Sequence, residues 1–179
     1  MITRILNVIT LSRIICAILI YLILYLENSY SIALFLFFIA SFSDFLDGYL
    51  ARKTNSESVL GEILDPIADK LLIVFVLIGL SVNLDSFLIG FISAVIISRE
   101  IWVAALRDIN SRNNQSGKTK VTFLAKTKTA IQMLTILMYL FGLTINNMMV
   151  LFFADIMLII ALLVTIQTGF QYTISTFKK

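Results

Sequence analysis

The segment Ser43–Lys70 reads SDFLDGYLARKTNSESVLGEILDPIADK and places four aspartates within stretches that otherwise resemble membrane helices. Asp44 and Asp47 are separated by one helical turn, and so are Asp65 and Asp69, so each pair shares one face of a helix. The polar link between the two pairs is short. It predicts an antiparallel helical hairpin in which the two acidic faces can meet.

Four carboxylates in such segments need compensation, because each ionised one near a helix centre costs about 2.5 to 3.5 kcal/mol. Hard oxygen ligands that converge in a cleft suit Mg²⁺ or Mn²⁺, which bind carboxylates together with substrate phosphates. A metal site is therefore our first interpretation. The alternative is a salt-bridge network in which the aspartates pair with Arg52, Lys53 and Lys70.

The composition places the whole chain in a lipid bilayer. Of its 179 residues, 59% are hydrophobic and 14% are charged, and the mean hydropathy is +0.97, far above the usual range of soluble domains. Only helices and closed barrels satisfy backbone hydrogen bonds in lipid, and the segments lack the alternation of barrel strands. We expect one all-α membrane-embedded domain over residues 1–179.

Six apolar segments are long enough to span the bilayer. We expect transmembrane helices at about residues 6–26, 31–51, 60–82, 86–106, 123–144 and 148–170, with a polar loop at 107–122. In the first of these, Arg13 would have to snorkel or lie at the interface.

Basic residues lie on one side of this arrangement. All 14 Lys and Arg residues fall in the half that also holds both termini, and the opposite links carry only Glu27 and Asp85. The positive-inside rule therefore predicts that both termini and the aspartates lie on the cytoplasmic side. We expect a multi-pass protein of the cytoplasmic (inner) membrane.

Several types of chemistry are excluded by the residues that are missing. The chain has no histidine, which removes the usual general base and the usual transition-metal ligand. Its single cysteine, Cys16, lies in an apolar stretch, so neither a disulfide framework nor a cysteine metal cluster is expected. Acid-base chemistry is left to carboxylates and amines.

The aspartates belong to a longer motif. Asp44-x-x-Asp47-Gly48-x-x-Ala51-Arg52, then eight residues, then Gly61-x-x-x-Asp65-x-x-x-Asp69 resembles the signature of the CDP-alcohol phosphatidyltransferases at every position. Taken alone, Gly48, Ala51 and Gly61 are equally typical of close helix packing. Beside the aspartates, their small side chains also leave room for a nucleotide.

This resemblance implies a role for each motif residue. Asp44, Asp47, Asp65 and Asp69 would bind two divalent metal ions, Mg²⁺ or Mn²⁺, and Asp69 would also be the general base. Gly48, Ala51, Arg52, Ser58 and Gly61 would line the CDP-diacylglycerol site. Asn7 and Thr10 match a further element of that site, although helix capping is an alternative for them. The resemblance also implies a homodimer, and no nucleic-acid partner is expected.

The acceptor alcohol is indicated by a second group of basic residues. Arg99, Arg107, Lys126 and Lys128 lie in segments similar to those of family members whose acceptor is sn-glycerol 3-phosphate, and they would bind its phosphate. They could instead be flanking charges of the positive-inside kind. Inositol phosphate and serine stay open as acceptors. A small cation or proton transporter with intramembrane aspartates is the alternative from another class.

Overall fold

The computed structural model describes residues 2–26, 29–54, 59–113 and 123–178, with side chains described for 8–26, 29–43, 61, 64–113 and 127–178. These residues form six α-helices and no strand. The helices are α1 (Ile2–Leu26), α2 (Tyr30–Thr54), α3 (Val59–Asn83), α4 (Phe87–Arg112), α5 (Phe123–Thr144) and α6 (Met148–Phe177). The expected all-α fold is confirmed.

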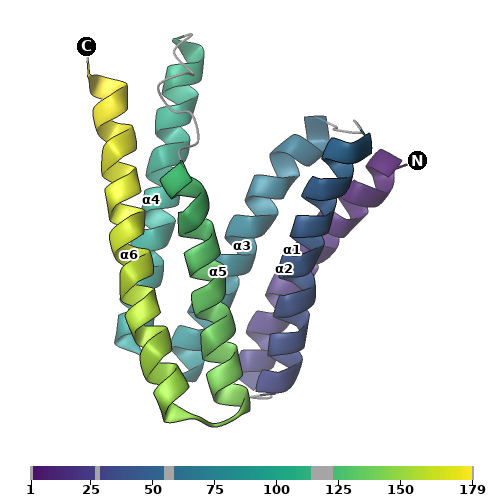
Figure 1. Ribbon diagram of the computed structural model, residues 1–179, viewed down its shortest axis with the longest axis vertical. Helices are drawn as coiled ribbons and strands as arrows, with labels where there is room; N and C mark the ends of the chain where they lie inside the picture. The colour runs from purple at the N-terminus through teal and green to yellow at the C-terminus, as the bar shows by residue number, and fades with distance from the viewer. Residues whose placement is uncertain (1, 27–28, 55–58, 114–122, 179) are drawn as a thin grey trace.

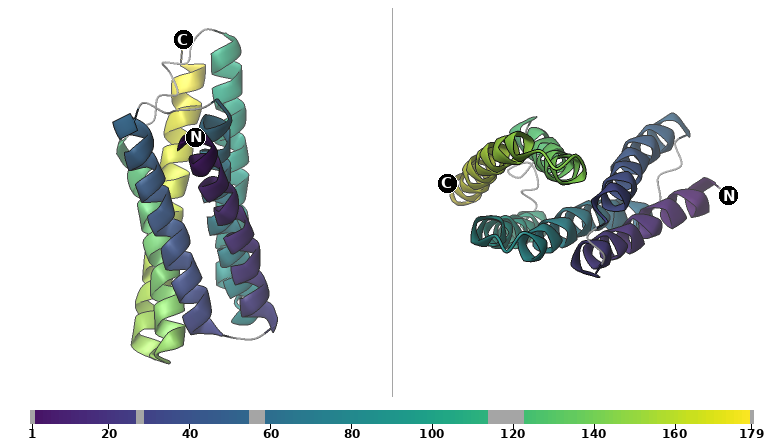
Figure 2. Two further views of the ribbon diagram at one scale, coloured as in Figure 1. Left: turned by 90° about the vertical axis from the view of Figure 1, so that its right-hand side faces the viewer. Right: turned by 90° about the horizontal axis from the view of Figure 1, so that it is seen from below.

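Consecutive helices run in opposite directions, so both termini lie at the same end of the bundle (Figure 1). Helices α1, α2 and α3 form one group, and α4, α5 and α6 form the other. The two groups pack together at the opposite end and diverge toward the termini (Figures 1 and 2). Contacts of α3 with α4 and of α2 with α5 join the groups.

Two tight turns close the end that lies away from the termini. Asp85 and Asn146 take positive φ values of 46° and 50°. In each turn the next residue donates a backbone hydrogen bond to the carbonyl five residues earlier, as Asn147 N does to Gly142 O at 2.9 Å. This pattern is typical of helix C-terminal caps. Ser86 and Asn147 then cap the next helices with their side chains.

Each helix buries a stripe of residues spaced three or four apart, as helical packing requires. On α1 the stripe is Ala17, Ile20 and Leu24, and these residues are fully buried. Equivalent stripes on the other helices complete one core, which includes Ala33, Phe37, Leu72, Val76, Ile92, Ile136 and Leu158.

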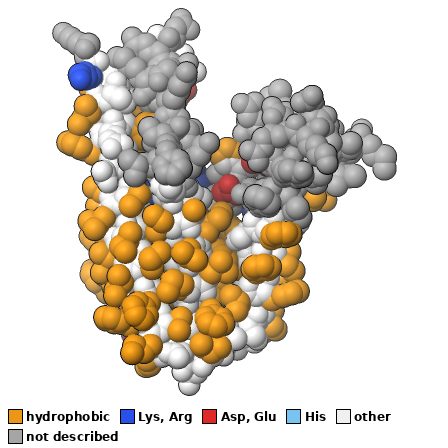
Figure 3. Space-filling view, in the orientation of Figure 1, with side chains coloured by type: hydrophobic (Ala, Val, Ile, Leu, Met, Phe, Trp, Pro, Cys, Tyr) orange, Lys and Arg blue, Asp and Glu red, His pale blue; other side chains and the backbone are white. Residues whose placement is uncertain are grey.

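The outward faces are also apolar. Large hydrophobic side chains such as Phe35, Phe152 and Leu163 are about 60% exposed (64%, 59% and 60%). Hydrophobic side chains cover most of the lower surface in Figure 3. A surface of this kind would be unstable in water and fits a lipid environment. The chain is therefore an integral membrane protein.

Three helices are long and apolar enough over their described residues to cross a membrane by composition alone: α1 at Val8–Leu26, α4 and α6. The other three carry polar residues of the candidate site, and they run between the same two ends (Figure 1). Crossing by all six stays a prediction.

Several helices are longer than the apolar segments that predicted them, and α4 and α6 are extended the most. Helix α4 continues to Arg112 and α6 to Phe177, so the expected loop at 107–122 is wrong over its first residues. Hydropathy marks only the part of a helix that lies in lipid. The intrahelical hydrogen bonds continue beyond it, and polar residues such as Arg107 then extend the helix.

Candidate functional site

The two groups of helices diverge toward the end that holds the termini. Between them, acidic and basic atoms of described residues are visible in Figure 3 above the mostly apolar lower surface. The polar residues at this level come from α1, α3, α4, α5 and α6. They form two neighbouring arrangements, one around the aspartates of α3 and one around Glu100 of α4.

The aspartates of α3 face α1. Thr10 donates a hydrogen bond from Oγ1 to Oδ1 of Asp65 at 2.8 Å, and Arg13 donates from Nη1 to Oδ1 of Asp69 at 2.9 Å. The one-turn spacing on α1 therefore matches the one-turn spacing on α3. This is possible because α1 and α3 pack closely along their length.

Arg13 does not snorkel to the membrane surface, which was one of the two placements expected for it. Its side chain is fully buried, and that of Asp69 is 24% exposed. Arg13 does not reach for the membrane surface, because a carboxylate on the neighbouring helix offers it a partner inside the protein. A buried charge of this kind requires such a partner.

The donor set of Asp65 and Asp69 suits a divalent cation. Carboxylate oxygens are the ligands that Mg²⁺ and Mn²⁺ prefer, and a carboxylate can accept several contacts while it also bonds to Thr10 or Arg13. Among the side chains that the structure describes, no group of three or more acidic, histidine or cysteine residues is arranged so that it could hold a metal ion. The side chains of Asp44 and Asp47 are not among the described ones, so the four-aspartate metal site stays a prediction.

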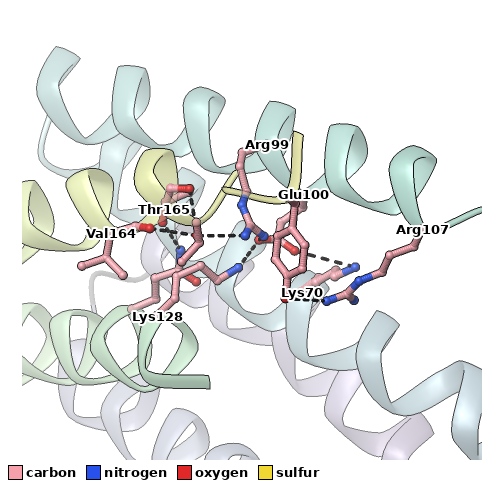
Figure 4. A network of polar contacts seen from close by, with 10 residues as sticks. Lys70, Arg99, Glu100, Arg107, Lys128, Val164 and Thr165 are labelled. Atoms are coloured by element: carbon pink, nitrogen blue, oxygen red, sulfur yellow. Dashed lines mark hydrogen bonds and ion pairs between the residues drawn. The ribbon is translucent and has the colours of Figure 1, made fainter. Parts of the chain in front are cut away.

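Glu100 is the centre of the second arrangement (Figure 4). Its Oε1 contacts Nη1 of Arg99 at 3.0 Å and also Nζ of Lys128, and its Oε2 lies 3.7 Å from Nζ of Lys70. The three cations come from α4, α5 and α3 respectively. One carboxylate thus joins three helices of the bundle.

Arg99 and Arg107 share Tyr172 of α6. Their guanidinium carbons lie 5.7 and 5.4 Å from the centre of the Tyr172 ring, and Nη2 of Arg107 is 3.5 Å from the tyrosine hydroxyl. Nη2 of Arg99 also donates to Thr168 Oγ1 at 2.8 Å. Three of the four residues expected to bind the acceptor phosphate, Arg99, Arg107 and Lys128, therefore gather in one cluster.

Lys70 connects the two arrangements. It directly follows Asp69 on α3, and its ammonium group pairs with Glu100. Lys70 thus has a carboxylate partner other than the four aspartates, whereas Arg52 and Lys53 of the salt-bridge alternative lie outside the described side chains. The cation cluster and the aspartates of α3 therefore lie at the same level of α3, on two different faces of that helix.

The remaining expected site residues are only partly described. Gly61 is half-buried on α3. Asn7 lies in α1 and Lys126 in α5, but their side chains fall outside the described ones. The side chains of the motif residues near the end of α2 are also outside the described ones: Asp44, Asp47, Gly48, Ala51 and Arg52. Ser58 lies wholly outside the described residues. The expected meeting of the two acidic faces thus stays a prediction.

Three residues of the site were missed in the sequence. Glu100 and Arg13 had a signal, because a charge in an apolar helix needs a partner, but nothing identified which one. Tyr172 had no signal, since a tyrosine near a helix end is ordinary in membrane proteins.

A six-helix membrane bundle with an acidic pair beside a cation cluster is a fold and a site suited to an enzyme that handles phosphate-containing substrates. The family profile of the CDP-alcohol phosphatidyltransferases matches residues 4–167. The chain belongs to this family of transferases, and the resemblance noted in its aspartate motif is confirmed.

Curated relatives share most of the chain. It is 38% identical over 149 residues to the CDP-diacylglycerol--glycerol-3-phosphate 3-phosphatidyltransferase of Haemophilus influenzae, covering 82% of this chain and 78% of the relative. It is 37% identical over 169 residues to the protein of the same name from Rickettsia bellii, covering 93% and 91%. The Escherichia coli protein of that name is 31% identical over 132 residues, covering 73% and 72%.

Proposed function

We propose that this protein transfers the phosphatidyl group of CDP-diacylglycerol to sn-glycerol 3-phosphate, which yields phosphatidylglycerophosphate and CMP. The observation that carries this proposal is the Lys70–Glu100 contact of 3.7 Å. It connects a cluster of cations, suited to the phosphate of a charged acceptor, to the residue that directly follows Asp69 on α3. The names of the relatives support the same acceptor.

In this reaction the acceptor hydroxyl attacks the phosphorus that carries the diacylglycerol. A new phosphorus–oxygen bond forms, the bond to the bridging oxygen of the diphosphate breaks, and CMP leaves. Asp69 accepts the hydroxyl proton as attack begins. Arg99, Arg107 and Lys128 hold the acceptor phosphate, joined by Lys126. This hold orients the hydroxyl toward the phosphorus.

Two divalent ions, Mg²⁺ or Mn²⁺, would be held by Asp44, Asp47, Asp65 and Asp69, and they would neutralise the diphosphate and the developing charge. Asn7, Thr10, Gly48, Ala51, Arg52, Ser58 and Gly61 would line the CDP-diacylglycerol site. Thr10 already contacts one of the proposed ligands, Asp65. The site opens toward the cytoplasm of a bacterial inner membrane, and the active protein is a homodimer.

The test is a purified enzyme assayed in detergent with CDP-diacylglycerol and Mg²⁺. CMP release is measured with glycerol 3-phosphate, glycerol, serine and inositol phosphate as acceptors. We expect glycerol 3-phosphate to give the highest kcat/KM. A higher value for another acceptor would overturn the assignment, and ion flux in liposomes without CMP release would favour the transporter alternative.

A further inference from the structure

Glu100 contacts cations that lie far apart in the sequence. Arg99 is its neighbour, but Lys70 and Lys128 come from different helices and reach the carboxylate from either side (Figure 4). The side chains of Arg99 and Lys128 are only 9% and 7% exposed. Two positive charges are therefore held almost entirely away from water.

The charges in this cluster do not balance. Three cations share one carboxylate, which leaves an excess of two positive charges among these four described residues. Nε of Arg99 is also buried and has no hydrogen-bond partner in the described part of the chain. A buried donor and excess positive charge both favour a bound anion, and a phosphate dianion would balance the charge.

We propose that Glu100 is a positioning residue for the acceptor phosphate, acting through Lys128 and Arg99. This proposal rests on the proposed function, because it concerns the same acceptor site. Glu100 itself repels a phosphate and binds none. Its role is to hold the two cations where a phosphate can reach both of them.

The cations depend on Glu100 for their placement. Within the described residues, Glu100 is the hydrogen-bond partner of Lys128, and lysine is a flexible side chain that moves toward water when it loses a buried partner. Without the carboxylate, Lys128 and Arg99 would also repel each other. The cluster would open, and a phosphate would have to reassemble it at a cost in affinity.

The first experiment compares wild type with Glu100→Gln, which keeps the shape but loses the charge. We expect the KM for glycerol 3-phosphate to rise about tenfold or more, while the KM for CDP-diacylglycerol stays within about twofold. A purely structural role would change stability but would not separate the two substrates.

Asp155→Asn is the matched control. Asp155 also pairs across two helices within the membrane region, accepting a hydrogen bond from Tyr139 at 2.5 Å, but it contacts none of the site residues described above. We expect this variant to lower thermal stability without a selective change in the KM for glycerol 3-phosphate.

A double-mutant cycle with Lys128→Gln tests the route. If Glu100 acts through Lys128 and Arg99, the rise in acceptor KM of the double variant should be smaller than the product of the two single effects, because only the part that passes through Arg99 is added to the effect of Lys128→Gln. Should Glu100→Gln fail to accumulate, Glu100→Asp carries the test, because its shorter side chain cannot reach all three cations. A smaller but selective rise in acceptor KM is then expected.

Unchanged acceptor KM in the Glu100 variants, equal changes for both substrates, or additive effects in the cycle would each overturn this proposal. None of these results affects the proposed function, provided that the wild-type enzyme still prefers glycerol 3-phosphate. If the wild-type enzyme prefers another acceptor, the proposed function fails, and the Glu100 proposal fails with it.

Discussion

Arg13 of α1 and Asp69 of α3 form an ion pair of 2.9 Å in which the arginine side chain is fully buried. The two residues are 56 positions apart in the sequence. The pairing holds the Asp69 carboxylate, which we propose as the general base, close to α1. The same helix contributes Thr10. Helix α1 therefore contributes contacts to the proposed reaction centre.

Arg13→Gln should destabilise the protein and lower kcat, because it leaves Asp69 without its buried cation. Breaking a buried pair from one side costs about 3 kcal/mol or more. The measurement is thermal unfolding in detergent beside a CMP-release assay. Thr10→Val, which removes a hydrogen bond to the Asp65 carboxylate but no charge, should cost less, about 1.5 kcal/mol. Equal unfolding temperatures for Arg13→Gln and wild type would contradict the importance of the pair.

Asp69→Asn keeps the shape of the side chain but cannot take a proton from the acceptor hydroxyl. We expect kcat to fall at least about a hundredfold while CDP-diacylglycerol still binds. Asp47→Asn should behave differently, since excess Mg²⁺ or Mn²⁺ should partly restore a lost metal ligand. If added metal restored Asp69→Asn just as fully, Asp69 would be a ligand and not the base.

Arg107→Gln and Lys126→Gln should each raise the KM for glycerol 3-phosphate and leave that for CDP-diacylglycerol nearly unchanged, because they remove binding of one substrate only. Arg112→Gln, on the same helix as Arg107, is the control. Arg112 pairs with Asp108 on the surface, where the two side chains are 76% and 57% exposed, and such pairs contribute little. Similar KM changes in all three variants would argue against a specific phosphate site.

Gly169 of α6 allows Arg99 to approach closely. A Cβ at this position would lie 3.1 Å from Cγ of Arg99, so Gly169→Ala should displace the arginine and raise the acceptor KM about threefold. Gly79→Ala is equally crowded, with Leu24 Cδ1 at 3.2 Å, but it lies in the apolar core. It should lower the unfolding temperature without a selective KM effect; the opposite pattern would refute the role of Gly169.

Topology can be tested by cysteine labelling in intact cells, in a Cys16→Ser background. An impermeant reagent added from outside should label Asn146→Cys, which lies in a turn at the end away from the termini. It should not label Ser56→Cys or Ser116→Cys, which the distribution of basic residues assigns to the cytoplasmic side. Labelling of Ser56→Cys or Ser116→Cys would show that the predicted orientation is wrong.

Much of this architecture could be predicted because its causes are local. Long apolar segments must be helical in lipid, and five helix starts fall within one residue of the expected positions, at Tyr30, Val59, Phe87, Phe123 and Met148. Polar residues in the two tight turns interrupt the apolar segments on either side of them, and these interruptions marked the helix ends. The spacing of Asp65 and Asp69 placed them on one face, and the motif around them indicated the family.

The partners of the charged residues could not be predicted in this way. Arg13 pairs with Asp69, Lys128 with Glu100, and Arg107 with Tyr172, across 56, 28 and 65 positions of sequence. The sequence shows that a charge in an apolar helix must be compensated, since the cost of burial is a property of the residue and its segment. Which residue compensates it depends on how distant helices pack and rotate against one another, and only the tertiary structure determines that.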